Sequence, residues 1–299
     1  MDLVPVFFKF IRIFKLCLYR NLLQSLIKKS IKIKIFCKNF NLWYNILTID
    51  HWGDVVRFGA RFILDKEPYF IPHDYRKHFL SLIKEAIKLS DIKLFEKFYG
   101  NNSKNRQKPF TFSVSFVSSD NQSEKGKIFL DSNKVTLHFS SFDPKVLINV
   151  YNGFVKLSKE KSLNYLGGSI QINRFFYKQR KLINSDRVTF KTLSPIVVRE
   201  LKDKKGVGFI DCNHPDFKKN LFYNVKSIAK VFLDYDLKED EFQIFDLRIK
   251  SKKVNIYGKE IANKGIFTVK APVSILQLIY DAGIGAKRSQ GFGMLEVIG

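Results

Sequence analysis

The chain has 299 residues, with 52 Lys and Arg against 28 Asp and Glu, and its formal net charge is +24 at pH 7. Such an excess favours a polyanionic partner, nucleic acid before anionic membrane, although a solvated surface in a basic-biased proteome gives the same balance. Three scattered cysteines exclude a zinc ribbon and argue against a disulfide framework, which indicates a reducing, cytoplasmic setting. Five histidines lack metal-ligand spacing, so we expect neither a metal nor another cofactor.

Residues 1–54 form a basic N-terminal extension that differs from the rest of the chain. They hold nine Lys or Arg and three acids, and the cations interrupt the apolar residues every few positions. No stretch therefore approaches the roughly 20 apolar residues of a membrane-spanning helix. We interpret the extension as an accessory segment or as sequence upstream of the native start. An amphipathic helix on a membrane surface is a third reading, but we expect no membrane partner.

From residue 55 onward, the spacing of apolar residues predicts strands and helices in a repeated order. Asp74 is the expected N-cap of the first helix, and Asp143 with Pro144 opens the second. The expected elements of the first set are a strand at 55–64, a helix at 75–89, strands at 110–117, 127–130 and 134–140, a helix from 144 to 155 and a strand at 170–177.

A second set follows in the same order. It comprises a strand at 187–199, a helix at 215–233, strands at 241–251 and 265–270, a helix at 273–280 and a strand at 294–298. Two tandem β-α-β-β-α-β units predict an α+β fold of two ferredoxin-like, RRM-like domains. We place the domains at residues 55–183 and 184–299, with a glycine-rich loop in the last helix-to-strand connection.

This loop, residues 283–293, contains Gly283, Gly285, Gly291 and Gly293 around Lys287 and Arg288. Glycines permit positive φ, so consecutive N–H groups can converge on an anion, and two cations at the tip would bind phosphate oxygens. Tight turns use the same residues. The helix-before-loop order is the reverse of a dinucleotide fingerprint, and no P-loop lysine motif is present. The loop therefore predicts contact with a polyphosphate backbone rather than with a nucleotide cofactor.

The loop sequence at 283–294 resembles the signature of the RAMP superfamily of CRISPR-associated proteins. The most similar branch is the repeat-processing endoribonuclease, the sixth numbered Cas family, and stretches at 70–76, 108–113 and 192–196 agree with it. The resemblance covers residues 56–298. It implies two ferredoxin-like domains and a metal-independent cut of the precursor transcript within each CRISPR repeat, which yields mature guide RNA. In that reaction a 2′-hydroxyl attacks its own phosphate, leaving a 2′,3′-cyclic phosphate and a 5′-hydroxyl.

Such a cut needs groups for two proton transfers and a cation for the phosphate charge. Many members of the family place a histidine just after the first helix, where this chain has Tyr99 and its neighbours, and no histidine lies between His78 and His138. Other members carry it within or beside that helix. This makes His78 the first candidate for the general base or acid and His73 the second. We assign His138, in a strand, a structural role.

Tyr99 and Lys84 are weaker catalytic candidates, as a hydrogen-bond donor and as a phosphate-stabilising cation. A spacing of six does not put Lys84 directly beneath His78, because helix neighbours are three or four apart, and a solvated face also explains this lysine. Arg106 and Lys108, in the loop before the second strand, are predicted to bind RNA, although a mobile polar loop fits them as well.

The implied partner is CRISPR repeat RNA. Because the histidine is missing at its common position, an alternative remains open, namely a non-catalytic repeat-RNA-binding subunit of a RAMP-type CRISPR complex with other effector subunits. A monomer and a homodimer are both compatible with the sequence.

Overall fold

The computed structural model describes residues 57–103, 106–119, 124–160, 162–166, 168–202, 205–255 and 259–299. The extension expected over residues 1–54 lies outside these ranges. Within them, no helix is long and apolar enough to cross a membrane.

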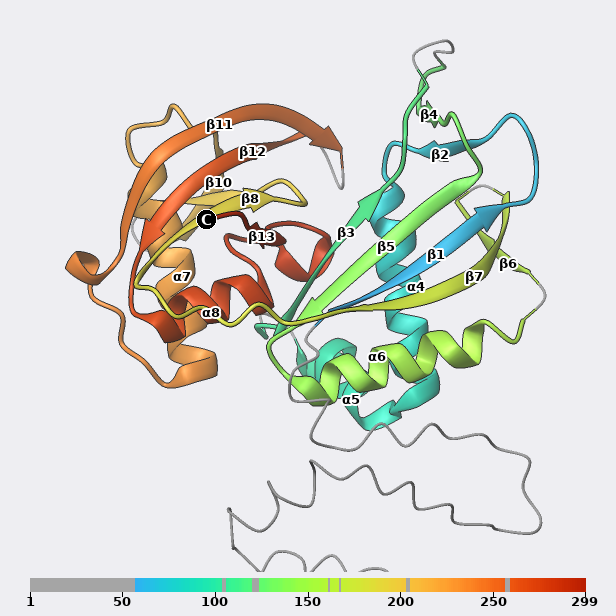
Figure 1. The fold of residues 1–299 in the computed structure, drawn as a ribbon, viewed down its shortest axis with the longest axis horizontal. Coiled ribbons are helices and arrows are strands. Elements are labelled where there is room, and N and C mark those ends of the chain that lie inside the picture. Colours follow the sequence, from blue (N-terminus) through green and yellow to red (C-terminus); the bar gives the residue numbers. More distant parts are fainter. Residues whose placement is uncertain are drawn as a thin grey trace, which may run out of the picture. The chain divides into compact units, whose positions relative to one another are not determined.

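The first half of the described chain is built on a five-stranded antiparallel sheet with strand order β3-β5-β1-β7-β6 (Figure 1). Its strands are β1 (Arg57–Leu64), β3 (Phe110–Ser115), β5 (Lys134–Ser141), β6 (Leu163–Tyr165) and β7 (Gly168–Lys178). The helices are α4 (Tyr75–Ser90), α5 (Ile92–Tyr99) and α6 (Pro144–Leu157). The short strands β2 (Phe70–Pro72) and β4 (Lys127–Phe129) pair with each other in a separate ribbon.

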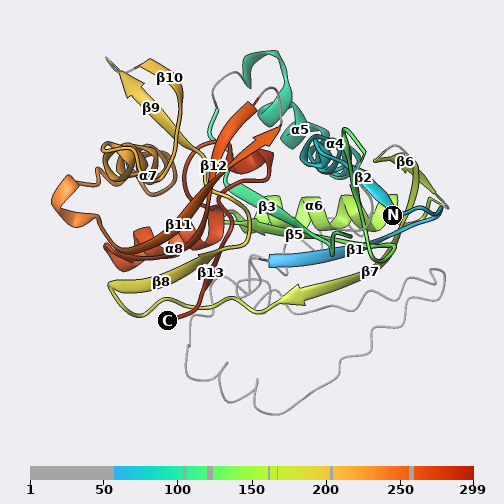
Figure 2. The same ribbon diagram turned by 90° about the horizontal axis from the view of Figure 1, so that it is seen from above.

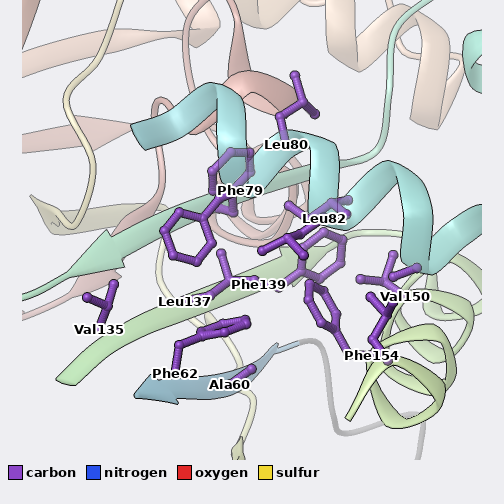
Figure 3. Packing of buried hydrophobic residues seen from close by; sticks show 14 of the residues in the cluster. Ala60, Phe62, Phe79, Leu80, Leu82, Val135, Leu137, Phe139, Val150 and Phe154 are labelled. Atoms are coloured by element: carbon purple, nitrogen blue, oxygen red, sulfur yellow. The ribbon is translucent and has the colours of Figure 1, made fainter. Parts of the chain in front are cut away.

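Apolar and polar side chains alternate along β5, and this alternation determines which face of the sheet the helices cover. Val135, Leu137 and Phe139 are fully buried, and they face the apolar side chains of α4 and α6 (Figure 3). Phe79 of α4 lies edge-on to Phe62 of β1, with ring centroids 5.4 Å apart. Because each fully buried phenylalanine contributes about 1.5–3 kcal/mol, this aromatic core accounts for much of the stability of the first half.

The second half contains a four-stranded antiparallel sheet with strand order β11-β12-β8-β13. Its strands are β8 (Arg187–Thr192), β11 (Gln243–Asn255), β12 (Lys259–Lys270) and β13 (Leu295–Val297). Its helices are α7 (Phe217–Leu233) and α8 (Val273–Ala282). A hairpin of β9 (Val198–Lys202) and β10 (Lys205–Ile210) stands between β8 and α7 in the chain, and β9 lies beside α7 (Figure 2).

In both halves the main elements follow the order β-α-β-β-α-β. The two sheets also share one spatial strand order, because β3-β5-β1-β7 in the first half corresponds to β11-β12-β8-β13 in the second. The predicted α+β class is confirmed, with antiparallel sheets. The strand expected over 187–199 is interrupted, because Pro195 has no N–H for a ladder bond; β8 ends at Thr192 and β9 begins at Val198. The sequence patterns did not indicate α5, whose N-cap is Asp91.

Candidate nucleic-acid interface

The glycine-rich loop connects α8 to β13, as the sequence predicted, and all four of its glycines have positive φ (84°, 80°, 89° and 68°). At two of them the structure also leaves no room for a side chain. A Cβ at Gly291 would lie 2.7 Å from the ring of Phe112, and one at Gly293 would lie 1.8 Å from the carbonyl oxygen of Ile284. The glycines therefore let the loop pack tightly against β3 and against itself.

Side chains fix the start of the loop by hydrogen bonds to the last three carbonyl groups of α8. Arg57 Nη2 donates to the Tyr280 oxygen at 2.5 Å, and Ser140 Oγ donates to the Asp281 oxygen at 2.6 Å. The third carbonyl, that of Ala282, accepts from Arg288 Nη1 at 2.8 Å. Guanidinium groups at a helix C-terminus satisfy carbonyls that lack helical partners and complement the negative end of the helix dipole.

The exit from the loop is also held by the first half. Thr111 Oγ1 of β3 donates to the Phe292 oxygen at 2.6 Å, and Arg76 Nε of α4 donates to the Gly291 oxygen at 3.3 Å. Both ends of the loop are thus fixed to side chains that lie far away in the sequence.

Several N–H groups of the loop are used within the protein. Those of Ile284, Ala286 and Gly293 donate to the carbonyl oxygens of Gly293, Val197 and Pro195. Those of Gln290 and Gly291 close turns on Lys287 and Arg288. These five donors hold the loop in shape, so an anion at the loop cannot draw on them.

The two cations of the loop have different environments, which corrects the expectation that both lie at its tip. The Arg288 side chain is buried, with 4% exposed; its Nη2 donates to Gln107 Oε1 at 3.1 Å, and burial lowers its pKa to about 10. Among the described residues no carboxylate pairs with it. Lys287 is half-buried, with Nζ 4.7 Å from the Phe209 ring centroid. Arg288 therefore shapes the loop, and Lys287 is the more accessible of the two cations.

Beside the loop lies a cleft of about 380 Å³ that draws its residues from both halves. Five cations and no carboxylate line it within the described part of the chain; the cations are Arg106, Lys108, Arg199, Lys287 and Arg288. Gln107 bridges its walls, because Nε2 lies 3.4 Å from Ser227 Oγ of α7. Arg106, Lys108 and Lys287, predicted separately from the sequence, are brought together here. A cleft with this charge suits the phosphates of a nucleic acid.

Lys108 also belongs to a second cluster, with Tyr99 and Lys84. The two ammonium groups lie 4.8 and 5.0 Å from the Tyr99 ring centroid. Burial, and then the charge of Lys84, lowers the pKa of Lys108. The Tyr99 hydroxyl is buried without a hydrogen-bond partner among the described residues, and burial raises its pKa well above the usual range. Tyr99 therefore stays protonated and supports the two lysines with its ring.

His78 is separate from this cluster in its described contacts. On α4, about a third of its side chain is exposed, and Nε2 lies 3.7 Å from Asp74 Oδ1. Asp74 is the N-cap of α4, as predicted, but its side chain makes no capping bond and pairs with Lys77 at 3.1 Å as well. The second candidate, His73, is exposed at the start of the same helix.

Several cleft residues were not anticipated, namely Arg199 and the α7 side chains Tyr223, Asn224 and Ser227. The polar face of the predicted helix at 215–233 was the only signal for the last three, and it does not distinguish a cleft from bulk solvent.

Comparison with known proteins finds similarity to one family. Residues 177–297 match the family described as CRISPR associated protein Cas6, C-terminal. The chain is 28% identical over 256 residues to the CRISPR-associated endoribonuclease Cas6 of Pyrococcus furiosus, covering 82% of this chain and 90% of that protein. It is 24% identical over 235 residues to the CRISPR-associated endoribonuclease Cas6 1 of Methanocaldococcus jannaschii, covering 75% and 86%.

Solved structures agree with the sequence relatives. A Cas6-related protein of Pyrococcus furiosus superimposes with a TM-score of 0.70 at 18% identity, over 82% of this chain and 98% of that one. A RAMP protein described as binding different RNA substrates gives 0.68 at 19% identity, over 82% and 100%. The C-terminal part of the chain therefore matches the Cas6 family, and the chain as a whole is similar in sequence to Cas6 endoribonucleases and in fold to solved Cas6-related and RAMP proteins.

Proposed function

We propose that this chain binds CRISPR repeat RNA and cuts the precursor transcript within each repeat to release guide RNA. Support comes from relatives named as endoribonucleases and from the RNA-binding RAMP protein of similar fold. The observation that carries the proposal to this chain is the cleft beside the glycine loop, with five cations and no carboxylate among its described lining residues.

We further propose that two domains form the walls of the cleft. We regard residues 55–183 and 184–299 as two ferredoxin-like domains, because both halves share one element order and one strand order. Each half also has its own large hydrophobic cluster, the first from β1 to β7 and the second from Ile183 to β13. The cleft then lies where the two domains meet the glycine loop.

The proposed reaction needs no metal. The 2′-oxygen attacks the neighbouring phosphorus and loses its proton to a base, the bond to the 5′-oxygen breaks, and that oxygen gains a proton from an acid. The products are a 2′,3′-cyclic phosphate and a 5′-hydroxyl. We assign one of the proton transfers to His78, with Asp74 to orient its ring, and keep His73 as the second candidate.

Cations surround the proposed path of the RNA backbone. Lys287, Arg106 and Lys108 bind phosphates in the cleft, and Lys84, next to Lys108 across the Tyr99 ring, adds charge near α4. Their summed charge would stabilise the additional negative charge of a pentacovalent phosphate. Gly283, Gly285, Gly291 and Gly293 contribute through the packing of the loop, as Arg288 does.

The test is cleavage of end-labelled host repeat RNA by the purified protein in EDTA, on a denaturing gel. We expect a single cut that is abolished by a 2′-deoxy substitution at the cut site. His78→Ala should slow the cut about a hundredfold or more, and His73→Ala, in the turn before the same helix, tests the second candidate alongside. A cut that survives His78→Ala but not His73→Ala would exchange their roles. A cut that requires a divalent metal would overturn the mechanism.

One observation favours a second function. His78 has no described contact with Lys84, Lys108 or Tyr99, so the proton-transfer group and the cation cluster are not joined in this structure. A repeat-RNA-binding subunit that does not cut would need only the cleft. Tight binding of repeat RNA without any cut in the same assay would establish that function instead.

A further inference from the structure

One wall of the cleft is the polar face of α7, and it carries groups suited to a base rather than to phosphate. Tyr223 is 37% exposed and lies beside Arg199 and Lys287 in the cleft lining. Asn224 and Ser227 follow it, and positions three apart on a helix share a face. An exposed aromatic ring among cations is the arrangement with which proteins hold unpaired bases.

Asn224 has a buried acceptor that no described residue uses. Its Nδ2 donates to the Asn220 oxygen at 2.8 Å, which fixes the orientation of the amide, and its Oδ1 is buried without a hydrogen-bond partner in the described part of the chain. A buried acceptor left unsatisfied costs about 1–3 kcal/mol, so such an atom calls for a donor. A phosphate cannot supply one, because its oxygens are themselves acceptors. Asn224 itself lines the cleft, so a small shift of the side chains that cover Oδ1 would add a carbonyl oxygen for an N–H group to the cations that suit an anion.

A nucleotide has both features. We propose that Tyr223 and Asn224 hold one unpaired RNA base, stacked on the tyrosine ring with an amino group donating to Asn224 Oδ1, while the cations bind the adjoining phosphates. The inference rests on the proposed RNA-binding function of the same cleft. A volume of about 380 Å³ lies within the range of small-ligand sites and leaves room for a base beside the backbone.

The acceptor also makes the site selective. Adenine and cytosine carry an exocyclic amino group that can reach Oδ1. Uracil carries carbonyl oxygens on both sides of its N–H, and these would face the amide oxygen unfavourably. With adenine or cytosine Oδ1 gains a hydrogen bond, whereas with uracil it stays buried and unpaired. This difference corresponds to an affinity about tenfold higher for adenine or cytosine than for uracil.

The experiment measures dissociation constants by fluorescence anisotropy for short single-stranded oligomers of adenylate, cytidylate and uridylate. Wild-type protein should bind the first two about tenfold more tightly than the third, and Asn224→Ala should remove this preference with little change for uridylate. Tyr223→Ala should weaken all three about tenfold or more, whereas Tyr223→Phe keeps the ring and should bind like wild type. Asn149→Ala is the matched control, because Asn149 also donates to the carbonyl four residues earlier but its Oδ1 already contacts Ser90.

The outcomes separate this inference from the function on which it rests. Wild-type binding that is equal for the three oligomers, or a preference that survives Asn224→Ala, would overturn the base site and leave RNA binding in place. Absence of binding to any oligomer, with repeat RNA also unbound, would overturn both. Thermal unfolding of Asn224→Ala should match that of wild type, because the change removes an unsatisfied acceptor; marked destabilisation would show instead that the amide serves the fold.

Discussion

Lys287→Ala should flatten the salt dependence of RNA binding, whereas Arg288→Met should leave it unchanged. The two residues are adjacent in the loop and both line the cleft, but Lys287 is half-buried, whereas Arg288 is 4% exposed with its guanidinium bonded to Ala282 and Gln107. Only a cation that meets phosphate displaces counterions from the RNA. The pair therefore tests the placement of charge in the loop rather than its net charge.

The expected change in the salt slope follows from the number of cleft cations that are not buried. These are Arg106, Lys108, Arg199 and Lys287. If each neutralises one phosphate of a single strand, log affinity falls with log salt at a slope of about −2.8. Without Lys287 the slope becomes about −2.1. Between about 50 and 200 mM salt, wild-type affinity should fall about 50-fold and that of Lys287→Ala about 20-fold.

The assay is anisotropy of labelled repeat RNA, made uncleavable by a 2′-deoxy nucleotide at the cut site, over a series of salt concentrations. Arg288→Met should bind with the wild-type slope and lose about 1–3 kcal/mol of unfolding free energy in urea, because two acceptors lose their donor. A slope that changes equally in both variants, or in neither, would refute the assignment of Lys287 to the RNA and Arg288 to the loop.

Three further predictions concern single residues. Burial and neighbouring positive charges lower the pKa of His138 to about 4, so the stability contributed by its neutral ring is complete above its ordinary pKa of 6.5 and is lost as pH falls toward 4. Urea unfolding should therefore show a loss of about 2 kcal/mol in unfolding free energy between about pH 7.5 and 5, and His138→Gln should remove this loss. A pH dependence that is the same in His138→Gln and in wild type would contradict the prediction. Gly293→Ala should destabilise by at least about 1–2 kcal/mol through its positive φ and the contact with Ile284, while Gly168→Ala, with open space around its Cβ, should be near neutral in the same thermal scan. Tyr99→Phe removes a buried hydroxyl that has no hydrogen-bond partner among the described residues, so cleavage rate and stability should change little; a hundredfold slower cut would make that hydroxyl catalytic.

Local signals in the sequence predicted most of the elements correctly. Asp143 and Pro144 mark the start of α6, and Asp143 accepts the Lys145 N–H at 2.9 Å, as a capping residue should. The glycine loop was found from its composition, and its positive φ values follow from the same glycines. The repeated order of strands and helices predicted from the apolar spacing is also found in the structure, where the same order occurs twice.

The environment of individual side chains could not be read in this way. Arg288 is buried because Gln107, 181 positions earlier, and Ala282 supply its acceptors, and no property of the loop sequence indicates those contacts. Asp74 is the N-cap of α4, but its carboxylate pairs with Lys77 and His78 instead of accepting a backbone N–H. The α7 wall of the cleft was missed for the same reason, since a polar helix face looks alike whether it borders water or a site.

The three hydrogen-bonded carbonyl groups at the end of α8 also affect how the cleft binds a ligand. Arg57 and Ser140 belong to the first half, and moving the halves apart would strip the Tyr280 and Asp281 oxygens of their donors inside the protein. Hinge opening at this joint is therefore costly, and the cleft is preorganised. RNA that enters it meets walls that are already ordered, so little entropy is lost by the protein on binding, and the fit depends on the shape of the RNA.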